Sequence, residues 1–316
     1  MSVLYQPLRQ GLQVRRSTVH SVRSAAMLAV VVSQIVAVPS RALQAQPSSV
    51  PRVVTTEWLA TEGVNRSVVL IEVVHAADAS PGIPGARTLA YDQLVMRRGT
   101  LSTELPSADS LRALFASLGV SDDSHVVVYA HEGPAATRAL FSLASIGHDR
   151  YSLLDGGLVK WRAEGRPVTT VQPRVAAGRL TPRPHRALVV DAQYVQSRIG
   201  RPGIALIDTR TDGEYNGTGN RSGMPSAGHI GGARQIEWET LFVDGTVTLK
   251  PRAELERLFA ERVQSGATVV TYCWIGYRAS ATWFVAHWLG YDVALYDGSY
   301  QDWMQRQLPT TAGSSP

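Results

Sequence analysis

The stretch "ATVVTYCWIGYRASATWFVAHWLG" (residues 267–290) joins a strand pattern to a helix pattern through a short turn. It begins with an apolar, β-branched run, Ala267–Tyr272, which predicts a buried strand. It ends with Ala279–Gly290, where apolar residues recur at helical spacing before a glycine, which predicts a helix. Cys273 opens the turn between the two elements, and Arg278 closes it.

Cys273 is the only cysteine in 316 residues. Free cysteines are commonly small buried hydrophobes without chemistry. This one is placed differently, because a strand-to-helix turn directs backbone N–H groups and a helix N-terminus toward whatever the sulfur carries. Arg278 adds a permanent positive charge at the end of the turn. The pattern therefore favours a thiolate nucleophile over a core cysteine.

Strand and helix patterns alternate through the second half of the chain. Strands are expected at Ile204–Asp208, Val269–Tyr272 and Asp292–Tyr296, and helices at Arg252–Arg262 and Ala279–Leu289. Such alternation predicts an α/β fold with a largely parallel central sheet and helices on both faces. Ligands in these sheets bind at the carboxyl ends of the strands, where Cys273 is expected.

The first half of the chain repeats the second. "VVLIEV" (68–73) corresponds to "IALIDT" (204–209), and "LLDGGLVKW" (153–161) corresponds to "LYDGSYQDW" (295–303). A repeat of this length indicates domain duplication rather than a solenoid. We therefore expect two tandem domains, residues 50–170 and 188–310. Residues 171–187, rich in proline and arginine, are the expected linker.

The N-terminal region has the pattern of a secretory signal peptide, expected over residues 1–45. A basic stretch with Arg15 and Arg16 precedes an apolar core, Ala25–Val38, and small residues follow up to Ala45. The alternatives are an uncleaved anchor and a chain that starts later, at Met27. Cleavage after the apolar core predicts a periplasmic or secreted protein.

Removal of this region changes the charge of the protein. The whole chain has 31 basic and 26 acidic residues, and residues 1–45 contain five arginines and no acid. The remainder is therefore electrically balanced. Basicity thus gives no reason to expect nucleic acid or an anionic membrane as a partner. A single cysteine also excludes an intramolecular disulfide and needs a functional reason in an oxidising compartment.

Four motifs resemble those of the two-domain rhodaneses, or thiosulfate sulfurtransferases. They are "LIDTRTDGEY" (206–215), "AGHIGGA" (227–233), "CWIGYR" (273–278) and "YDGSYQDW" (296–303). The resemblance covers residues 50 to 308. It implies two rhodanese-like domains, of which only the second is active. In the first domain the functional groups are replaced: Ala130, Ala135 and Val74 stand where the second has Cys273, Arg278 and Arg210.

The resemblance also implies a mechanism and a set of site residues. The Cys273 thiolate takes a sulfur atom from a small-molecule donor as a persulfide and passes it to a thiol or to cyanide. The implied substrate-binding residues are Trp274, Ile275, Gly276, Tyr277, Arg278 and Arg210. Asp208, Glu214 and His229 are expected to support the site, with an Asp208–Arg210 ion pair as the alternative to substrate contact by Arg210. No cofactor or metal is expected, because one cysteine and scattered histidines give no ligand spacing.

Four other functions are alternatives to a thiosulfate sulfurtransferase. Cysteine phosphatases and arsenate reductases have five residues between cysteine and arginine, whereas four separate Cys273 from Arg278. The smaller loop suits a single sulfur atom and argues against both. A 3-mercaptopyruvate sulfurtransferase stays open, although Trp274 and Ile275 do not resemble the small loop residues of that branch. A non-catalytic sulfur carrier that serves a partner protein also stays open.

Overall fold

The computed structural model describes residues 50–63, 68–75, 81–184, 186–219 and 227–315. All of them lie within one compact unit, residues 48–316. The expected signal peptide, residues 1–45, lies outside the described residues, so its cleavage stays a prediction.

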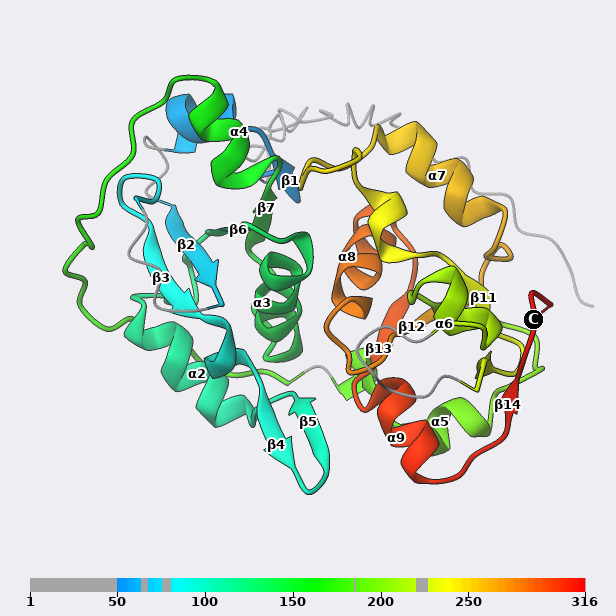
Figure 1. Ribbon diagram of the computed structural model, residues 1–316. Coiled ribbons are helices and arrows are strands. Elements are labelled where there is room, and N and C mark those ends of the chain that lie inside the picture. Colours follow the sequence, from blue (N-terminus) through cyan, green and yellow to red (C-terminus); the bar gives the residue numbers. More distant parts are fainter. Residues whose placement is uncertain (1–49, 64–67, 76–80, 185, 220–226, 316) are drawn as a thin grey trace, which may run out of the picture. The chain divides into compact units, whose positions relative to one another are not determined.

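The first half of the chain forms a parallel sheet of five strands in the order β1-β7-β6-β2-β3 (Figure 1). Its strands are β1 (Val53–Val54), β2 (Val69–Val74), β3 (Arg87–Ala90), β6 (Val126–Ala130) and β7 (Tyr151–Leu154). Strands β2 and β6 are buried along their whole length. Burial on both faces is the reason that parallel strands are continuous apolar runs in the sequence.

The second half repeats this sheet in the order β11-β9-β12-β13-β8, again with parallel neighbours. Its strands are β8 (Val189–Val190), β9 (Ile204–Asp208), β11 (Arg234–Gln235), β12 (Thr268–Tyr272) and β13 (Val293–Tyr296). Every strand has a counterpart at the same position in the first sheet. The predicted fold class, two tandem α/β domains with parallel sheets, is confirmed.

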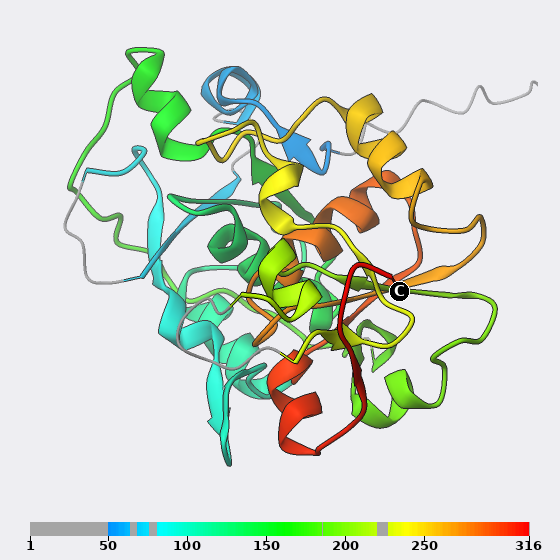
Figure 2. The ribbon, with the colours of Figure 1, turned by 45° about the vertical axis from the view of Figure 1, so that its right-hand side comes forward.

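Helices cover both faces of each sheet (Figures 1 and 2). The first domain has α1 (Thr56–Trp58), α2 (Ala108–Ser117), α3 (Gly133–Ser145) and α4 (Gly157–Ala163). The second has α5 (Ala192–Gln196), α6 (Asp212–Asn216), α7 (Arg252–Ala260), α8 (Ala279–Leu289) and α9 (Ser299–Gln305). Short helical turns are η1 (Leu59–Gly63), η2 (Tyr91–Leu94), η3 (Arg186–Leu188) and η4 (Trp238–Leu241).

Helices α3 and α8 pack against each other where the two domains meet (Figure 1). All residues of α3 are buried. The rings of Phe141 and Trp283 meet edge to face with centroids 5.0 Å apart, and Thr137 Oγ1 lies 2.9 Å from Ser280 Oγ. The largest apolar cluster contains residues from both helices and both sheets. The two domains therefore share one continuous core.

Two small antiparallel pairs and the linker complete the described chain. The segment between the domains packs along the first one: Gly178 N–H donates to Ala116 O (2.8 Å), and Arg183 N–H donates to Ile146 O (2.7 Å). The antiparallel pairs are β4 (Met96–Arg98) with β5 (Leu101–Glu104) and β10 (His229–Ile230) with β14 (Thr310–Thr311).

Candidate active site

A six-residue loop, residues 273–278, connects β12 to α8 and is here called the cysteine loop. Strand β12 lies in the middle of its sheet, between β9 and β13. The loop therefore sits at the carboxyl edge of the sheet, the usual ligand site of α/β folds. Thr271 Oγ1 closes its base by donating to Ala279 O (3.2 Å).

Cys273 opens the loop and is completely buried as a free thiol. Its backbone N–H donates to Ser299 Oγ (3.3 Å), and Ser299 O–H in turn donates to Tyr296 O (2.8 Å). Ser299 has a φ of 53°, in the left-handed region that a serine adopts only at a cost. Such strain is typical of functional sites. Here it places a hydroxyl where the Cys273 amide needs an acceptor.

The middle of the loop is held closely by its surroundings. Gly276 has a φ of +80°, and a Cβ there would lie 2.8 Å from Asp297 O. Only glycine fits without displacing the backbone. Ile275 O accepts a hydrogen bond from Thr103 Oγ1 of the first domain (2.6 Å). Both domains therefore shape the loop.

Tyr277 points to the first domain, where it contacts three side chains. Its hydroxyl donates to Glu132 Oε2 (3.0 Å) and lies 2.9 Å from His75 Nε2. Its ring lies edge-on to Tyr91 with centroids 5.0 Å apart. Burial and the negative charge of Glu132 raise the pKa of Tyr277 far above its ordinary value, so the hydroxyl stays protonated.

Arg278 closes the loop through a two-pronged ion pair with Glu214. Arg278 Nη1 lies 2.7 Å from Glu214 Oε2, and Nη2 lies 2.8 Å from Oε1. Glu214 also forms a capping box with Thr211 at the start of α6. Burial alone would raise the pKa of Glu214, but the hydrogen bonds and charge of Arg278 lower it to about 2. The pair therefore balances the charge of Arg278 at neutral pH.

Asp208 and Arg210 form a second ion pair behind the loop, and both are completely buried. Arg210 Nη2 donates to Asp208 Oδ2 (2.6 Å) and to Gly228 O (2.8 Å). The guanidinium lies 3.8 Å from the ring centroid of Tyr300. The half-buried Trp274 packs against the same ring at 5.3 Å. Arg210 Nη1 has no hydrogen-bond partner among the described residues, but the side chain is completely buried, so a substrate contact by Arg210 stays a prediction.

His229 is a completely buried residue of β10. Its ring stacks on Tyr215 with centroids 3.8 Å apart, and its Nδ1 lies 3.0 Å from Tyr215 O. Tyr215 O–H donates to Ala233 O (2.7 Å). These contacts tie α6 to the "AGHIGGA" segment. Because α6 supplies Glu214, they give His229 an indirect path to Arg278; its supporting role stays a prediction.

The first domain has no corresponding loop in this fully described stretch. Strand β6 ends at Ala130, and α3 begins at Gly133, so only His131 and Glu132 lie between them. Ala135, the counterpart of Arg278, lies inside the helix. The replaced residues Ala130, Ala135 and Val74 are all buried in the apolar core. The first domain thus retains the fold but lacks a counterpart of the cysteine loop.

Both halves of the chain are similar to known proteins. A family model described as "Rhodanese-like domain" fits residues 55–164 and 191–306. The chain belongs to the rhodanese family. The thiosulfate sulfurtransferase of Pseudomonas aeruginosa is 32% identical over 260 residues, which cover 81% of this chain and 95% of the relative. That of Azotobacter vinelandii is 31% identical over the same shares. These relatives confirm that the chain is a rhodanese-type sulfurtransferase.

A solved structure shows the same rhodanese fold. The 3-mercaptopyruvate sulfotransferase SseA of Escherichia coli aligns with a TM-score of 0.69 at 24% identity. The alignment covers 79% of this chain and 99% of that one. At this identity the likeness concerns the fold alone.

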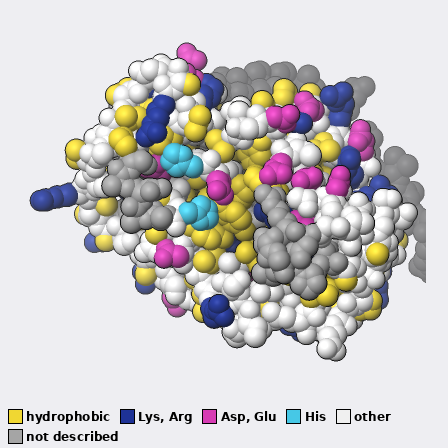
Figure 3. Space-filling view, viewed as in Figure 1, with side chains coloured by type: hydrophobic (Ala, Val, Ile, Leu, Met, Phe, Trp, Pro, Cys, Tyr) yellow, Lys and Arg dark blue, Asp and Glu magenta, His cyan; other side chains and the backbone are white. Residues whose placement is uncertain are grey.

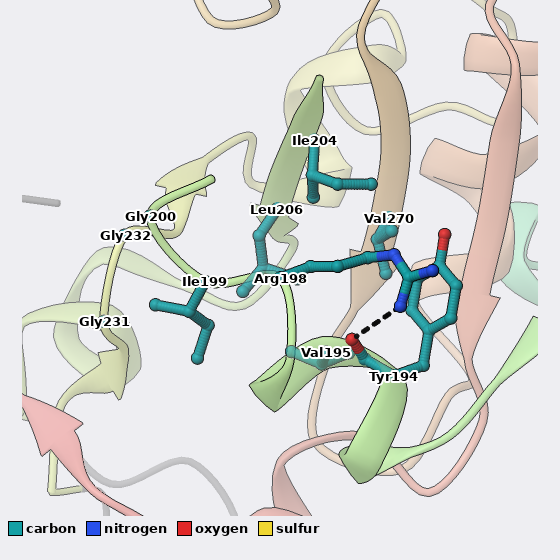
Figure 4. Close-up of a pocket in the computed structure, with 10 residues that line it drawn as sticks. All are labelled: Tyr194, Val195, Arg198, Ile199, Gly200, Ile204, Leu206, Gly231, Gly232 and Val270. Atoms are coloured by element: carbon teal, nitrogen blue, oxygen red, sulfur yellow. Dashed lines mark hydrogen bonds between the residues drawn. The ribbon is translucent and has the colours of Figure 1, made fainter. Parts of the chain in front are cut away.

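Several cavities in the described part of this rhodanese lie outside the cysteine loop, and two of them differ widely in size. One, of about 670 Å³, lies between residues 131–133 of the first domain and residues 238–248 of the second. Figure 3 shows apolar side chains gathered between the two halves on the face that it views. The other, of only about 30 Å³, is lined by Arg198, Ile204 and Val270 beside α5 (Figure 4). It lies toward the amino end of β9, and Cys273 is not among the residues that line it.

The described residues form neither a cluster of metal ligands nor a helix that could span a membrane. In the described part of this rhodanese, no three histidine, cysteine, aspartate or glutamate side chains gather as metal ligands would. The helices of the described ranges are all too short or too polar to span a membrane.

Several residues at the cysteine loop were not predicted from the sequence. Ser299 and Asp297 belong to the motif "YDGSYQDW", which carries both the repeat and the family resemblance but does not single out either residue. The first-domain side chains at the loop are Thr103, His75, Tyr91, Glu132 and Arg138. No local pattern marks these five, because their partners lie more than a hundred residues away in the chain.

Proposed function

We propose that this rhodanese transfers the outer sulfur of thiosulfate to a thiol or to cyanide through a persulfide on Cys273. The observation that carries the proposal is the cysteine loop, in which the only thiol of the chain is wrapped by a backbone of six residues and closed by Arg278. The thiosulfate sulfurtransferases that are about 30% identical support the choice of donor.

The reaction proceeds as two displacements at sulfur. The Cys273 thiolate attacks the outer sulfur of thiosulfate, and the sulfur–sulfur bond of the donor breaks as sulfite leaves with its electron pair. The acceptor then attacks the terminal sulfur of the persulfide. The Cys273 thiolate leaves with the electrons of that bond, and thiocyanate or a new persulfide is released.

The loop stabilises the persulfide mainly through its backbone. N–H groups that are fixed in advance around a developing negative charge act as donors without reorganisation. The Cys273 N–H is already committed to Ser299, so the donors that remain are those of residues 274–278. Arg278, paired with Glu214, keeps the end of the loop closed and contributes positive charge at short range.

The direct test is sulfur loading of Cys273. After incubation with thiosulfate, intact-mass analysis without reductant should show one added sulfur, about 32 Da, that cyanide removes as thiocyanate. Cys273→Ser should abolish the adduct and the turnover. Residual turnover of the Ser variant within about a hundredfold of the parent would contradict the proposal.

Two alternatives are separated by the same assay. If 3-mercaptopyruvate is the donor, it should give a higher kcat/KM than thiosulfate. A relative in Arabidopsis thaliana named "Thiosulfate/3-mercaptopyruvate sulfurtransferase 2" is 28% identical over 293 residues, so both donors need testing. A carrier that serves only a partner protein would load once and release no thiocyanate.

We further propose that the protein is exported, on the basis of the basic and apolar pattern in residues 1–45. Expression of the full chain in a Gram-negative host should give a shortened protein in the periplasmic fraction. Replacing the apolar core Ala25–Val38 with polar residues should keep the chain in the cytoplasm. Unprocessed chain in the cytoplasm of the parent strain would contradict export.

A further inference from the structure

Arg138 is a completely buried arginine of the first domain that lies against the cysteine loop of the second. From α3 it donates through Nη1 to Asp297 Oδ1 (2.8 Å) and through Nη2 to Thr103 O (2.9 Å). Its Nε has no hydrogen-bond partner among the described residues. Burying such a charge is costly, and a buried ion pair is a weak source of stability. Its position at the loop needs another explanation.

One path from Arg138 to the loop runs through Thr103. The Thr103 carbonyl accepts from Arg138 Nη2, while the Thr103 hydroxyl donates to Ile275 O (2.6 Å). The guanidinium therefore fixes the backbone of β5 at the residue that holds the loop. A change in the position of Thr103 would be transmitted directly to the peptide between Ile275 and Gly276.

A second path runs through Asp297. Besides pairing with Arg138, Asp297 accepts the N–H of Leu105 at Oδ2 (2.6 Å). Asp297 O and Oδ1 form the wall against which Gly276 packs, and Arg138 Nη1 lies only 3.5 Å from where a Cβ of Gly276 would be. Asp297 also stands two residues before Ser299, the acceptor of the Cys273 N–H. The start and the middle of the loop thus depend on the same pair.

The internal repeat provides a comparison within the molecule. Asp155 is the counterpart of Asp297, and its Oδ1 likewise accepts an N–H from the other domain, that of Leu249 (2.8 Å). At the offset that relates Ala130 to Cys273, however, Arg138 corresponds to Ala281. Each domain therefore has an aspartate, Asp155 or Asp297, that accepts an N–H from the other domain. The arginine is present only on the side of the junction that has the cysteine.

We propose that Arg138 is a positioning residue for sulfur transfer, which acts through Thr103 and Asp297 to hold the cysteine loop around Cys273. The first domain then supplies a part of the active site that the second lacks. This inference rests on the proposed persulfide chemistry, and it concerns the shape of the loop rather than the identity of the donor.

The test compares four variants of the full chain. Arg138→Met removes the guanidinium and keeps an unbranched side chain, and Arg138→Lys keeps the charge. Thr103→Val removes only the hydroxyl that reaches Ile275. Asp155→Ala is the matched control, because it breaks the equivalent contact on the side without a cysteine. Each is measured for kcat and KM with thiosulfate, for Tm, and for hydrogen exchange of a peptide that covers residues 273–278.

Arg138→Met should lower kcat by about tenfold or more and change KM by less than about threefold, because the loop and not donor binding is affected. Arg138→Lys should recover part of the loss, since an ammonium can reach Asp297 but cannot also span to Thr103. Thr103→Val should lower kcat about threefold to tenfold, and the double variant with Arg138→Met should show less than the product of the two losses. Exchange in the loop peptide should be faster in Arg138→Met and in Thr103→Val.

Asp155→Ala should lower Tm while it leaves kcat and loop exchange at the parent values. A fall in kcat as large as that of Arg138→Met would show a general effect of the junction and overturn the proposal. So would Thr103→Val with parent kcat and parent exchange, which decides the matter if Arg138→Met does not fold. Hydrogen exchange needs no sulfur donor, so failure of the loop inference remains distinguishable from failure of the proposed reaction.

Discussion

At the scale of single residues, Glu214 partly neutralises the positive charge of Arg278 and so weakens the attraction of Arg278 for an anionic substrate. The two side chains form a paired and largely buried unit, with 4% and 13% of their surfaces exposed. The sequence suggested that Arg278 holds an anionic donor. The structure adds a structural task, because the pair also joins the end of the cysteine loop to the cap of α6.

Arg278→Leu should therefore affect both stability and catalysis. Removal of the guanidinium takes away the counter-charge that Arg278 gives the buried carboxylate of Glu214, which costs about 3–5 kcal/mol and should lower Tm by at least about 6 °C. The value of kcat/KM for thiosulfate should fall about ten- to a hundred-and-fifty-fold, the equivalent of about 1.5–3 kcal/mol. Thermal unfolding and steady-state kinetics measure both effects. Adding Glu214→Gln should restore part of Tm and none of the turnover; recovery of both would show that Arg278 matters for stability alone.

Ser299→Gly separates backbone strain from hydrogen bonding. Glycine removes the left-handed strain, worth about 1–2 kcal/mol, but loses the hydroxyl that bonds Tyr296 O and the Cys273 N–H, each about 1 kcal/mol. Tm should change by less than about 4 °C. Turnover should fall about threefold to tenfold, since the start of the loop is released. Ser299→Ala, which keeps the strain, should be less stable than Ser299→Gly; the reverse order would mean that the φ value carries no cost.

Glu72 is the first-domain counterpart of Asp208, but the arginine that would pair with it is replaced by Val74. One of its carboxyl oxygens has no hydrogen-bond partner among the described residues. Burial raises the pKa of Glu72, and the hydrogen bond with Tyr129 offsets only part of this rise. The folded state therefore binds the proton more tightly than the unfolded chain does. Stability is lost as pH rises from 4.5 through the higher folded value.

Glu72→Gln should remove this loss, because the amide has the same shape and no charge. Its Tm should exceed that of the parent by about 2 °C or more at pH 8, and the gap should shrink toward pH 5. Scanning calorimetry at several pH values measures the gap. A constant gap across that range would show that Glu72 does not titrate in it.

At the scale of elements, the two strand-to-helix turns explain why one domain is active. In the second domain six residues separate β12 from α8, whereas α3 starts almost directly after β6. Of the six positions that form the cysteine loop in one domain, only the last three, residues 133–135, are helical in the other. Restoring the thiol alone would place it against a helix without converging N–H groups.

Ala130→Cys in a Cys273→Ser background should therefore stay inactive, with turnover at least about a thousandfold below the parent. Thiocyanate production is the measurement, and intact mass after thiosulfate shows whether the new thiol takes up sulfur. Substantial turnover by this double variant would mean that neither the missing loop nor Ala135 and Val74 matter.

The sequence predicted the elements well where apolar periodicity was strong. Strand β9 and helix α8 have the predicted bounds, and β12 begins only one residue earlier, at Thr268. Helix α7 ends at Ala260, not at Arg262, because a helical pattern does not show where the last turn unwinds. The position of Cys273 followed from the same patterns, since a strand and a helix define the turn between them.

The contacts between domains could not be predicted in this way. Ile275 meets Thr103 across 172 residues, and Asp297 meets Arg138 across 159. Residues so far apart leave no periodic signal in the chain, and a buried arginine looks like a surface one until the fold is known. Only a comparison of the two repeats could have drawn attention to Arg138. The corresponding position in the second domain, Ala281, has no charged side chain.

At the scale of the whole molecule, the shared core makes the two domains one cooperative unit. Residues 188–316 alone should not form a stable enzyme, since they would expose the apolar face of α8 around Trp283 and lose Thr103 and Arg138. We expect aggregation or a loosely packed state without turnover, observed by light scattering and near-ultraviolet circular dichroism. A soluble monomer with parent kcat would contradict both the shared core and the role of Arg138.

The packing of α3 on α8 also has a consequence for the newly made chain. Helix α3 is complete at Ser145, but α8 begins only at Ala279. At about 5–20 residues per second, synthesis of the intervening chain takes about 7–27 s, during which the face of α3 that will meet α8 has no cover. The first domain therefore leaves the ribosome with an exposed apolar surface, which stays exposed until the second domain has been made. Chaperones that bind apolar segments would act in this interval, and a faster translation of residues 146–279 would shorten it.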